Sequence, residues 1–140
     1  MATHLEEGEV DAFIIKLKAF LSNISYRFRQ KNDKRERERH FQYTFYLIMQ
    51  MIGQYNTYVE KETSQGRIDC VVECQRYVYI FEFKLDGSAE KAIKQIHEKG
   101  YAAPYLADER PVYLLGINFS SETGSIDDVV VEEMKQHRRT

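Results

Sequence analysis

A chain of 140 residues is long enough for one domain with a sizeable buried core. Hydrophobic residues make up 43% of the sequence and charged residues 30%, which is a globular composition and excludes wholesale disorder. The formal net charge of −2 excludes a global basic field that would attract nucleic acid, so an interpretation as a DNA-binding protein must rest on local patches.

The sequence also indicates the cellular compartment in which we expect the protein. No apolar run approaches the ~18 residues of a membrane span, and the acidic segment 1–11 lacks the layout of a signal peptide. The two cysteines, Cys70 and Cys74, are expected on one strand, about 13 Å apart and too distant for a disulfide. We therefore expect reduced thiols and a cytoplasmic protein without a membrane partner.

Two helical patterns come first in the chain. Residues 11–28 carry apolar side chains at helical spacing, which predicts an N-terminal helix. Residues 31–39 form a dense run of mixed charge, and we interpret residues 1–35 as the helix and its connector, followed by a domain over residues 36–140. A second helix is predicted over residues 38–53; it is apolar on most of its surface and is therefore expected to be central.

The hydrophobic period then changes to two, which predicts strands. Three strands are predicted, over residues 55–63, 67–74 and 77–84. A helix follows over residues 89–99, with a cap at Ser88 and a stop at Gly100. An apolar strand over residues 112–119 comes next, and residues 126–131 predict a short fifth strand at an edge.

Charged residues interrupt the third strand, which is otherwise apolar on both faces. Glu82 and Lys84 share one face of it, because strand side chains alternate. The plainer interpretation is a Glu–Lys pair at the solvated end of the strand. A two-residue hairpin loop, however, places Asp69 of the second strand directly opposite Glu82.

Two facing carboxylates with Cβ atoms about 5 Å apart repel one another. Such a pair persists where a cation lies between the acids or where one acid is protonated for catalysis. Oxygen ligands favour Mg²⁺ or Mn²⁺ over Zn²⁺. Lys84, about 6.6 Å beyond Glu82 on the same face, could reach a phosphate or an attacking water. Asp69, Glu82 and Lys84 are therefore the candidate catalytic residues for phosphodiester hydrolysis.

The residues Gly66 to Asp69, then Glu82 to Lys84, then a helix that carries Gln95, resemble the PD-(D/E)XK nuclease superfamily. The resemblance implies an α/β fold with a restriction-endonuclease-like α-β-β-β-α-β core and a mixed central sheet, here with an extra N-terminal helix. Nearly the whole chain is similar to the nuclease-like C-terminal domain of bacterial proteins that also carry an AAA-ATPase-like domain. An AAA-ATPase-like domain or protein is thus an implied partner, together with DNA.

By this resemblance, Asp69 and Glu82 are metal ligands and Lys84 is the catalytic lysine. Glu38, at the start of the first core helix, is the candidate for a further metal ligand, with a solvated helix start as its alternative. Tyr101 is interpreted as a packing residue, with stacking on a base as the alternative. The candidate nucleic-acid contacts are Arg67, Lys94 and Gln95.

The leading functional hypothesis is Mg²⁺- or Mn²⁺-dependent cleavage of DNA. Its alternative is a catalytically weak or inactive nuclease-fold domain that acts as a nucleic-acid-binding or ATPase-associated interaction module. The sequence leaves the oligomeric state open, although the edge near residues 126–131 could pair between subunits.

Overall fold

The computed structural model describes residues 2–25, 47, 56–62, 67–120, 122 and 125–134. In chain order its elements are α1 (Ala2–Glu6), α2 (Val10–Ser25), β1 (Asn56–Glu62), β2 (Arg67–Glu73), β3 (Val78–Leu85), α4 (Ala89–Lys99), the 3-10 helix η3 (Ala103–Tyr105), β4 (Val112–Ser120) and β5 (Ser125–Met134). The helix predicted over residues 38–53 lies outside the described residues except at residue 47, which is helical.

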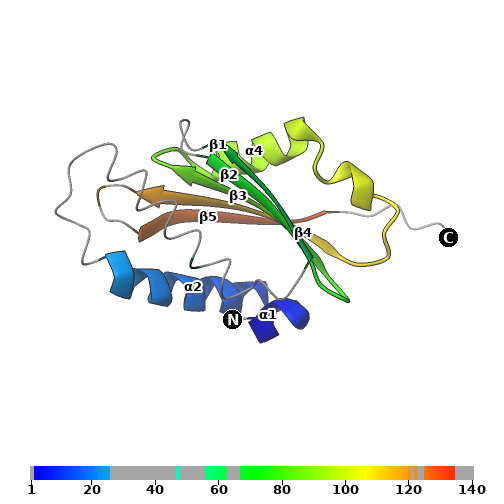
Figure 1. The fold of residues 1–140 in the computed structure, drawn as a ribbon, viewed down its shortest axis with the longest axis horizontal. Helices are drawn as coiled ribbons and strands as arrows, with labels where there is room; N and C mark the ends of the chain where they lie inside the picture. The colour runs from blue at the N-terminus through cyan, green and yellow to red at the C-terminus, as the bar shows by residue number, and fades with distance from the viewer. Residues whose placement is uncertain are drawn as a thin grey trace.

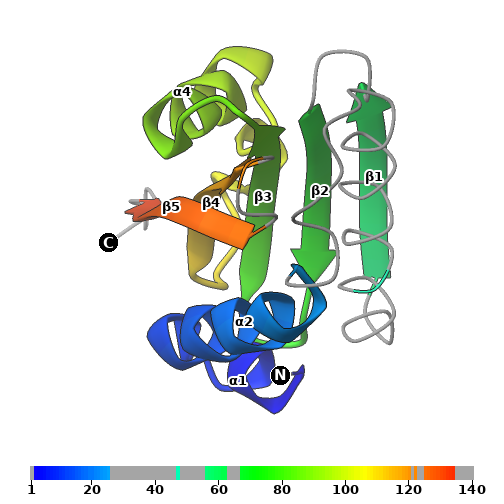
Figure 2. The same ribbon diagram turned by 90° about the vertical axis from the view of Figure 1, so that its left-hand side faces the viewer.

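The five strands form one sheet in the order β1-β2-β3-β4-β5. β3 and β4 run parallel, while the other neighbouring pairs are antiparallel, so the sheet is mixed as predicted. α4 connects the two parallel strands and lies on one side of the sheet, whereas α1 and α2 lie on the other (Figure 1). Figure 2 shows β1, β2 and β3 side by side. β5 is an edge strand, but at ten residues it is longer than predicted, because its pairing with β4 continues to Met134.

Side chains of the central strands alternate between two apolar cores, one on each side of the sheet. The core on the α2 side includes Cys70, Val72, Tyr79, Phe81, Phe83, Leu115 and Ile117 from the strands, with Leu5, Phe13 and Leu17 from the helices. The core on the α4 side includes Val71, Val78, Ile80, Val112 and Leu114 from the strands, with Ile93 and Ile96 from α4. Glu82 and Lys84 continue the alternate series of β3 that begins with Val78 and Ile80, so the candidate site belongs to the α4 side.

The predicted ends of α4 are confirmed. The Ser88 side chain accepts a hydrogen bond from the Lys91 amide at 3.1 Å, which caps the first turn. Gly100 ends the helix in the left-handed conformation, with φ 70°, and its amide donates to the His97 carbonyl. The two caps set the ends of the helix, and the C-terminal cap thereby fixes the positions of Lys99, the last helical residue, and of Tyr101, which follows the cap.

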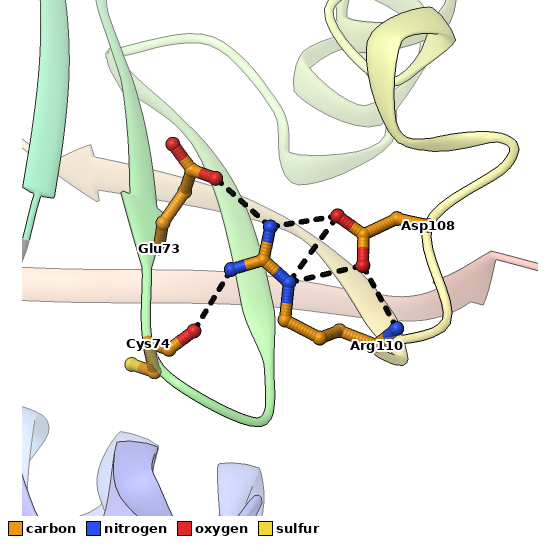
Figure 3. Close-up of polar contacts among 4 residues, drawn as sticks. All are labelled: Glu73, Cys74, Asp108 and Arg110. Atoms are coloured by element: carbon orange, nitrogen blue, oxygen red, sulfur yellow. Dashed lines mark hydrogen bonds and ion pairs between the residues drawn. The ribbon is translucent and has the colours of Figure 1, made fainter.

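A polar cluster around Arg110 holds the C-terminal end of β2 (Figure 3). The Arg110 guanidinium donates to the Asp108 carboxylate, with Nη2 to Oδ2 at 2.6 Å, and to Glu73 Oε1 at 3.0 Å. It also donates to the Cys74 carbonyl at 3.0 Å. This guanidinium lowers the pKa of Asp108 through its hydrogen bonds. The cluster therefore links the β2–β3 hairpin to the segment that enters β4.

Both cysteines are buried and neither forms a disulfide, as predicted. Burial, with the nearby Asp69 charge, raises the pKa of the Cys70 thiol to about 12. Burial likewise raises the pKa of Cys74 to about 11. Among the described residues, no helix has both the length and the apolar character needed to cross a membrane.

Candidate metal centre

Asp69 of β2 and Glu82 of β3 are directly opposed in the antiparallel pairing of the two strands. The hairpin that sets this register closes with the Cys74 amide donating to the Tyr77 carbonyl at 2.8 Å, across a two-residue loop. Asp69 is 3% exposed and Glu82 is 0% exposed. The predicted adjacency of two buried carboxylates on one side of the sheet is confirmed.

Lys84 lies near the end of β3, half-buried, between Arg67 of β2 and Asn118 of β4 in the strand register. Asn118 is the polar exception in an apolar strand and is 3% exposed. Its side chain accepts from the Gly87 amide and donates to Asp127 Oδ1, each at 2.8 Å. Asn118 thus holds the turn that follows Lys84 against β4, which limits the movement of the strand end that carries the lysine.

Two side chains that were not predicted as site residues contact Asp69. The Tyr101 hydroxyl donates to Asp69 Oδ2 at 3.0 Å, and Lys99 Nζ lies 3.3 Å from the same oxygen. Tyr101 also packs against the core on the α4 side, so its interpretation as a packing residue describes only part of its role. The sequence carried one signal for Lys99, which follows Gln95 by one helical turn and so shares its helix face.

The remaining predicted residues are placed as follows. The Lys94 side chain is 76% exposed, with Nζ 3.9 Å from Glu98 Oε1, while Gln95 is half-buried. The backbone of Arg67 lies in β2, but its side chain is outside the described part of the structure. Glu38, the predicted further acid, is also outside the described residues. Within the described ranges, His, Cys, Asp and Glu form no group of three or more suited to a metal ion.

The two strand carboxylates fit a hard divalent cation. Their oxygen donors are those that Mg²⁺ and Mn²⁺ prefer. Two acids that are buried and opposed on neighbouring strands repel each other, and positive charge between them offsets that repulsion. Lys99 supplies one positive charge at Asp69, whereas a divalent ion would supply two to the pair.

Comparison with known proteins identifies a family whose match includes the candidate site. A family model described as the PD-(D/E)XK nuclease superfamily matches residues 36–129, a range that contains Asp69, Glu82 and Lys84. The chain is 35% identical over 118 residues to an "Uncharacterized protein in vnfD 5'region" from Azotobacter chroococcum mcd 1. That alignment covers 83% of this chain and 23% of the relative, so the chain spans about a quarter of that protein's length. No solved structure matches the chain.

Proposed function

Because the chain belongs to the PD-(D/E)XK nuclease superfamily, we propose that it hydrolyses phosphodiester bonds in DNA with Mg²⁺ or Mn²⁺ as cofactor. One observation carries the proposal: Asp69 and Glu82 are buried and directly opposed across two strands, and Lys84 follows on the same face. A metal-dependent nuclease uses such a combination, since the cation is held beside a group that contacts the phosphate.

Each residue then has a distinct role. Asp69 and Glu82 hold the metal through their carboxylate oxygens. The metal, when bound, supplies Lewis-acid polarisation of the phosphate and acidifies a water. The Lys84 ammonium donates to a phosphate oxygen and stabilises the charge that grows on it in the transition state. Asn118 acts through the turn after Lys84 and keeps the strand end in place.

Cleavage of supercoiled plasmid in Mg²⁺ or Mn²⁺ tests the proposal. Asp69→Asn, Glu82→Gln and Lys84→Met should each reduce nicking by about 100-fold or more, because the first two remove a proposed metal ligand and the third removes the ammonium that contacts the phosphate. Glu133→Gln removes an exposed carboxylate on β5 and should retain activity, which controls for charge. Circular dichroism checks that the fold is kept. The proposal is rejected if the purified wild-type protein cuts in neither metal, or if the three site variants still cut.

A second candidate function is a module that binds nucleic acid or an AAA-ATPase-like partner without cutting. In the longer relative, the matching segment is 23% of the protein, so a domain of this kind can occur beside further sequence with which it could interact. Under this alternative, Asp69→Asn retains whatever binding the wild-type protein shows, and no metal-dependent nicking is detected. Salt-dependent binding to DNA would identify the nucleic-acid-binding form, because phosphate contacts release counterions.

A further inference from the structure

Two polar groups contact Asp69 Oδ2: the ammonium of Lys99, the last residue of α4, and the hydroxyl of Tyr101, which follows the C-cap. Lys99 Nζ is 3.3 Å from this oxygen and the Tyr101 hydroxyl is 3.0 Å from it. The Asp69 side chain is 4% exposed, whereas that of Lys99 is 26% exposed. One cation therefore already contacts an oxygen that the proposed metal would bind, and this cation has access to solvent.

Lys99 and Tyr101 differ in their freedom to move. Lys99 is the last residue of α4, and its ammonium ends a four-carbon stem with several rotatable bonds. The Tyr101 ring is rigid and packs against the core on the α4 side. Lys99 Nζ also lies 6.0 Å from the centroid of that ring, so the ammonium could withdraw along the aromatic face without any movement of the backbone.

We propose that Lys99 is an internal counter-ion that neutralises Asp69 in the metal-free protein and is displaced when the divalent ion binds, while Tyr101 keeps its hydrogen bond. An ammonium and a divalent ion repel each other at one carboxylate oxygen, so the two cations compete. Lys99 thereby regulates the affinity of the site for metal. This inference rests on the metal site of the proposed function, but it does not require that the protein cuts DNA.

Titration with Mn²⁺ in the absence of DNA tests the competition. Lys99→Met should bind Mn²⁺ about tenfold more tightly than the wild-type protein, a difference of about 1.4 kcal/mol, since no ammonium has to be displaced. Lys91→Met is the matched control, because Lys91 is an exposed lysine of the same helix, and its affinity should stay within about twofold of wild type. Equal or weaker binding by Lys99→Met overturns the proposal.

A second measurement uses the wild-type protein, so that it does not depend on the folding of a variant. Lysine acetylation is followed by mass spectrometry with and without saturating Mn²⁺. Lys99 should be modified faster with Mn²⁺, while the rate at Lys91 is unchanged. An unchanged rate at Lys99 overturns the proposal. If Lys99→Met binds Mn²⁺ more tightly but the wild-type protein never nicks plasmid, the proposed nuclease function is rejected and this inference stands. If the protein nicks plasmid but Lys99→Met does not change Mn²⁺ affinity, this inference is rejected and the nuclease function stands.

Discussion

Gly116 of β4 packs directly against the main chain of Ala89 at the start of α4. A Cβ atom at Gly116 would lie 2.3 Å from the Ala89 carbonyl oxygen and 3.0 Å from the Ala92 Cβ. Gly116 is also the register partner of Glu82. The absence of a side chain at Gly116 therefore lets the first turns of α4 approach the sheet beside the acidic pair.

We predict that Gly116→Ala destabilises the fold by about 1–3 kcal/mol, because the added methyl group meets backbone that cannot rotate away. Urea unfolding measures the change. Gly100→Ala is the comparison, because it adds a methyl group where no atom lies within 4 Å. It should cost about 1 kcal/mol of stability, owing only to the left-handed backbone conformation of that residue. A loss for Gly116→Ala no larger than that of Gly100→Ala would show that the close approach does not limit stability.

Glu82→Gln should make the metal-free protein more stable by roughly 1 kcal/mol, although it removes a proposed catalytic residue. The reason is that the substitution ends the repulsion between Glu82 and Asp69, which face each other in a buried position. Thermal unfolding without metal measures this gain, with Glu133→Gln as the control. Added Mg²⁺ should raise the melting temperature of the wild-type protein and not that of Glu82→Gln. A less stable metal-free variant would contradict the prediction.

The opposition of Asp69 and Glu82 could be predicted because both residues belong to one hairpin. A two-residue loop sets the register of antiparallel strands, and a side-chain period of two then assigns each residue to a face. The ends of α4 were equally predictable, since Ser88 and Gly100 are local signals.

The contacts of Lys99 and Tyr101 with Asp69 could not be predicted in the same way. They depend on where α4 crosses the sheet, and that position follows from tertiary packing, including that of Ile96 in the core and of Ala89 on Gly116. Nothing local to Tyr101 distinguishes a buried packing residue from one that also donates to a carboxylate. Tertiary packing decides between these roles.

Arg110→Met should lower stability at neutral pH by about 1–2 kcal/mol, because it removes charge-assisted hydrogen bonds to Asp108 and Glu73 (Figure 3). The pKa of Asp108 is lowered from 3.8 in the folded state, so its contribution is present above that value and is lost as the pH falls through the folded pKa. The difference between wild type and variant should therefore shrink in acid, as urea unfolding at several pH values would show.

Arg76→Met is the comparison for this prediction, since the exposed Arg76 donates to the Glu6 carbonyl at 3.3 Å and its interaction with the exposed Glu7 carboxylate is a weaker, through-space one. Its effect on stability should be small and should vary with pH much less than that of Arg110→Met. A pH-independent difference for Arg110→Met would mean that packing of the arginine stem, and not its pairing with Asp108, accounts for the loss.

Cys70 and Cys74 should both resist thiol reagents in the native protein. Burial raises the pKa of Cys70 to about 12 and that of Cys74 to about 11, so near pH 8 almost none of either thiol is in the reactive thiolate form. Cys74 should react before Cys70 as denaturant is added, because it lies beyond the end of β2 while Cys70 is within the strand. Absorbance of the released thiol product follows both, and Cys70→Ala and Cys74→Ala assign the two phases. Rapid labelling of Cys70 in the native state would show that β2 separates from its neighbouring strands. Such separation would also displace the adjacent Asp69, whose carboxylate the proposed metal site requires.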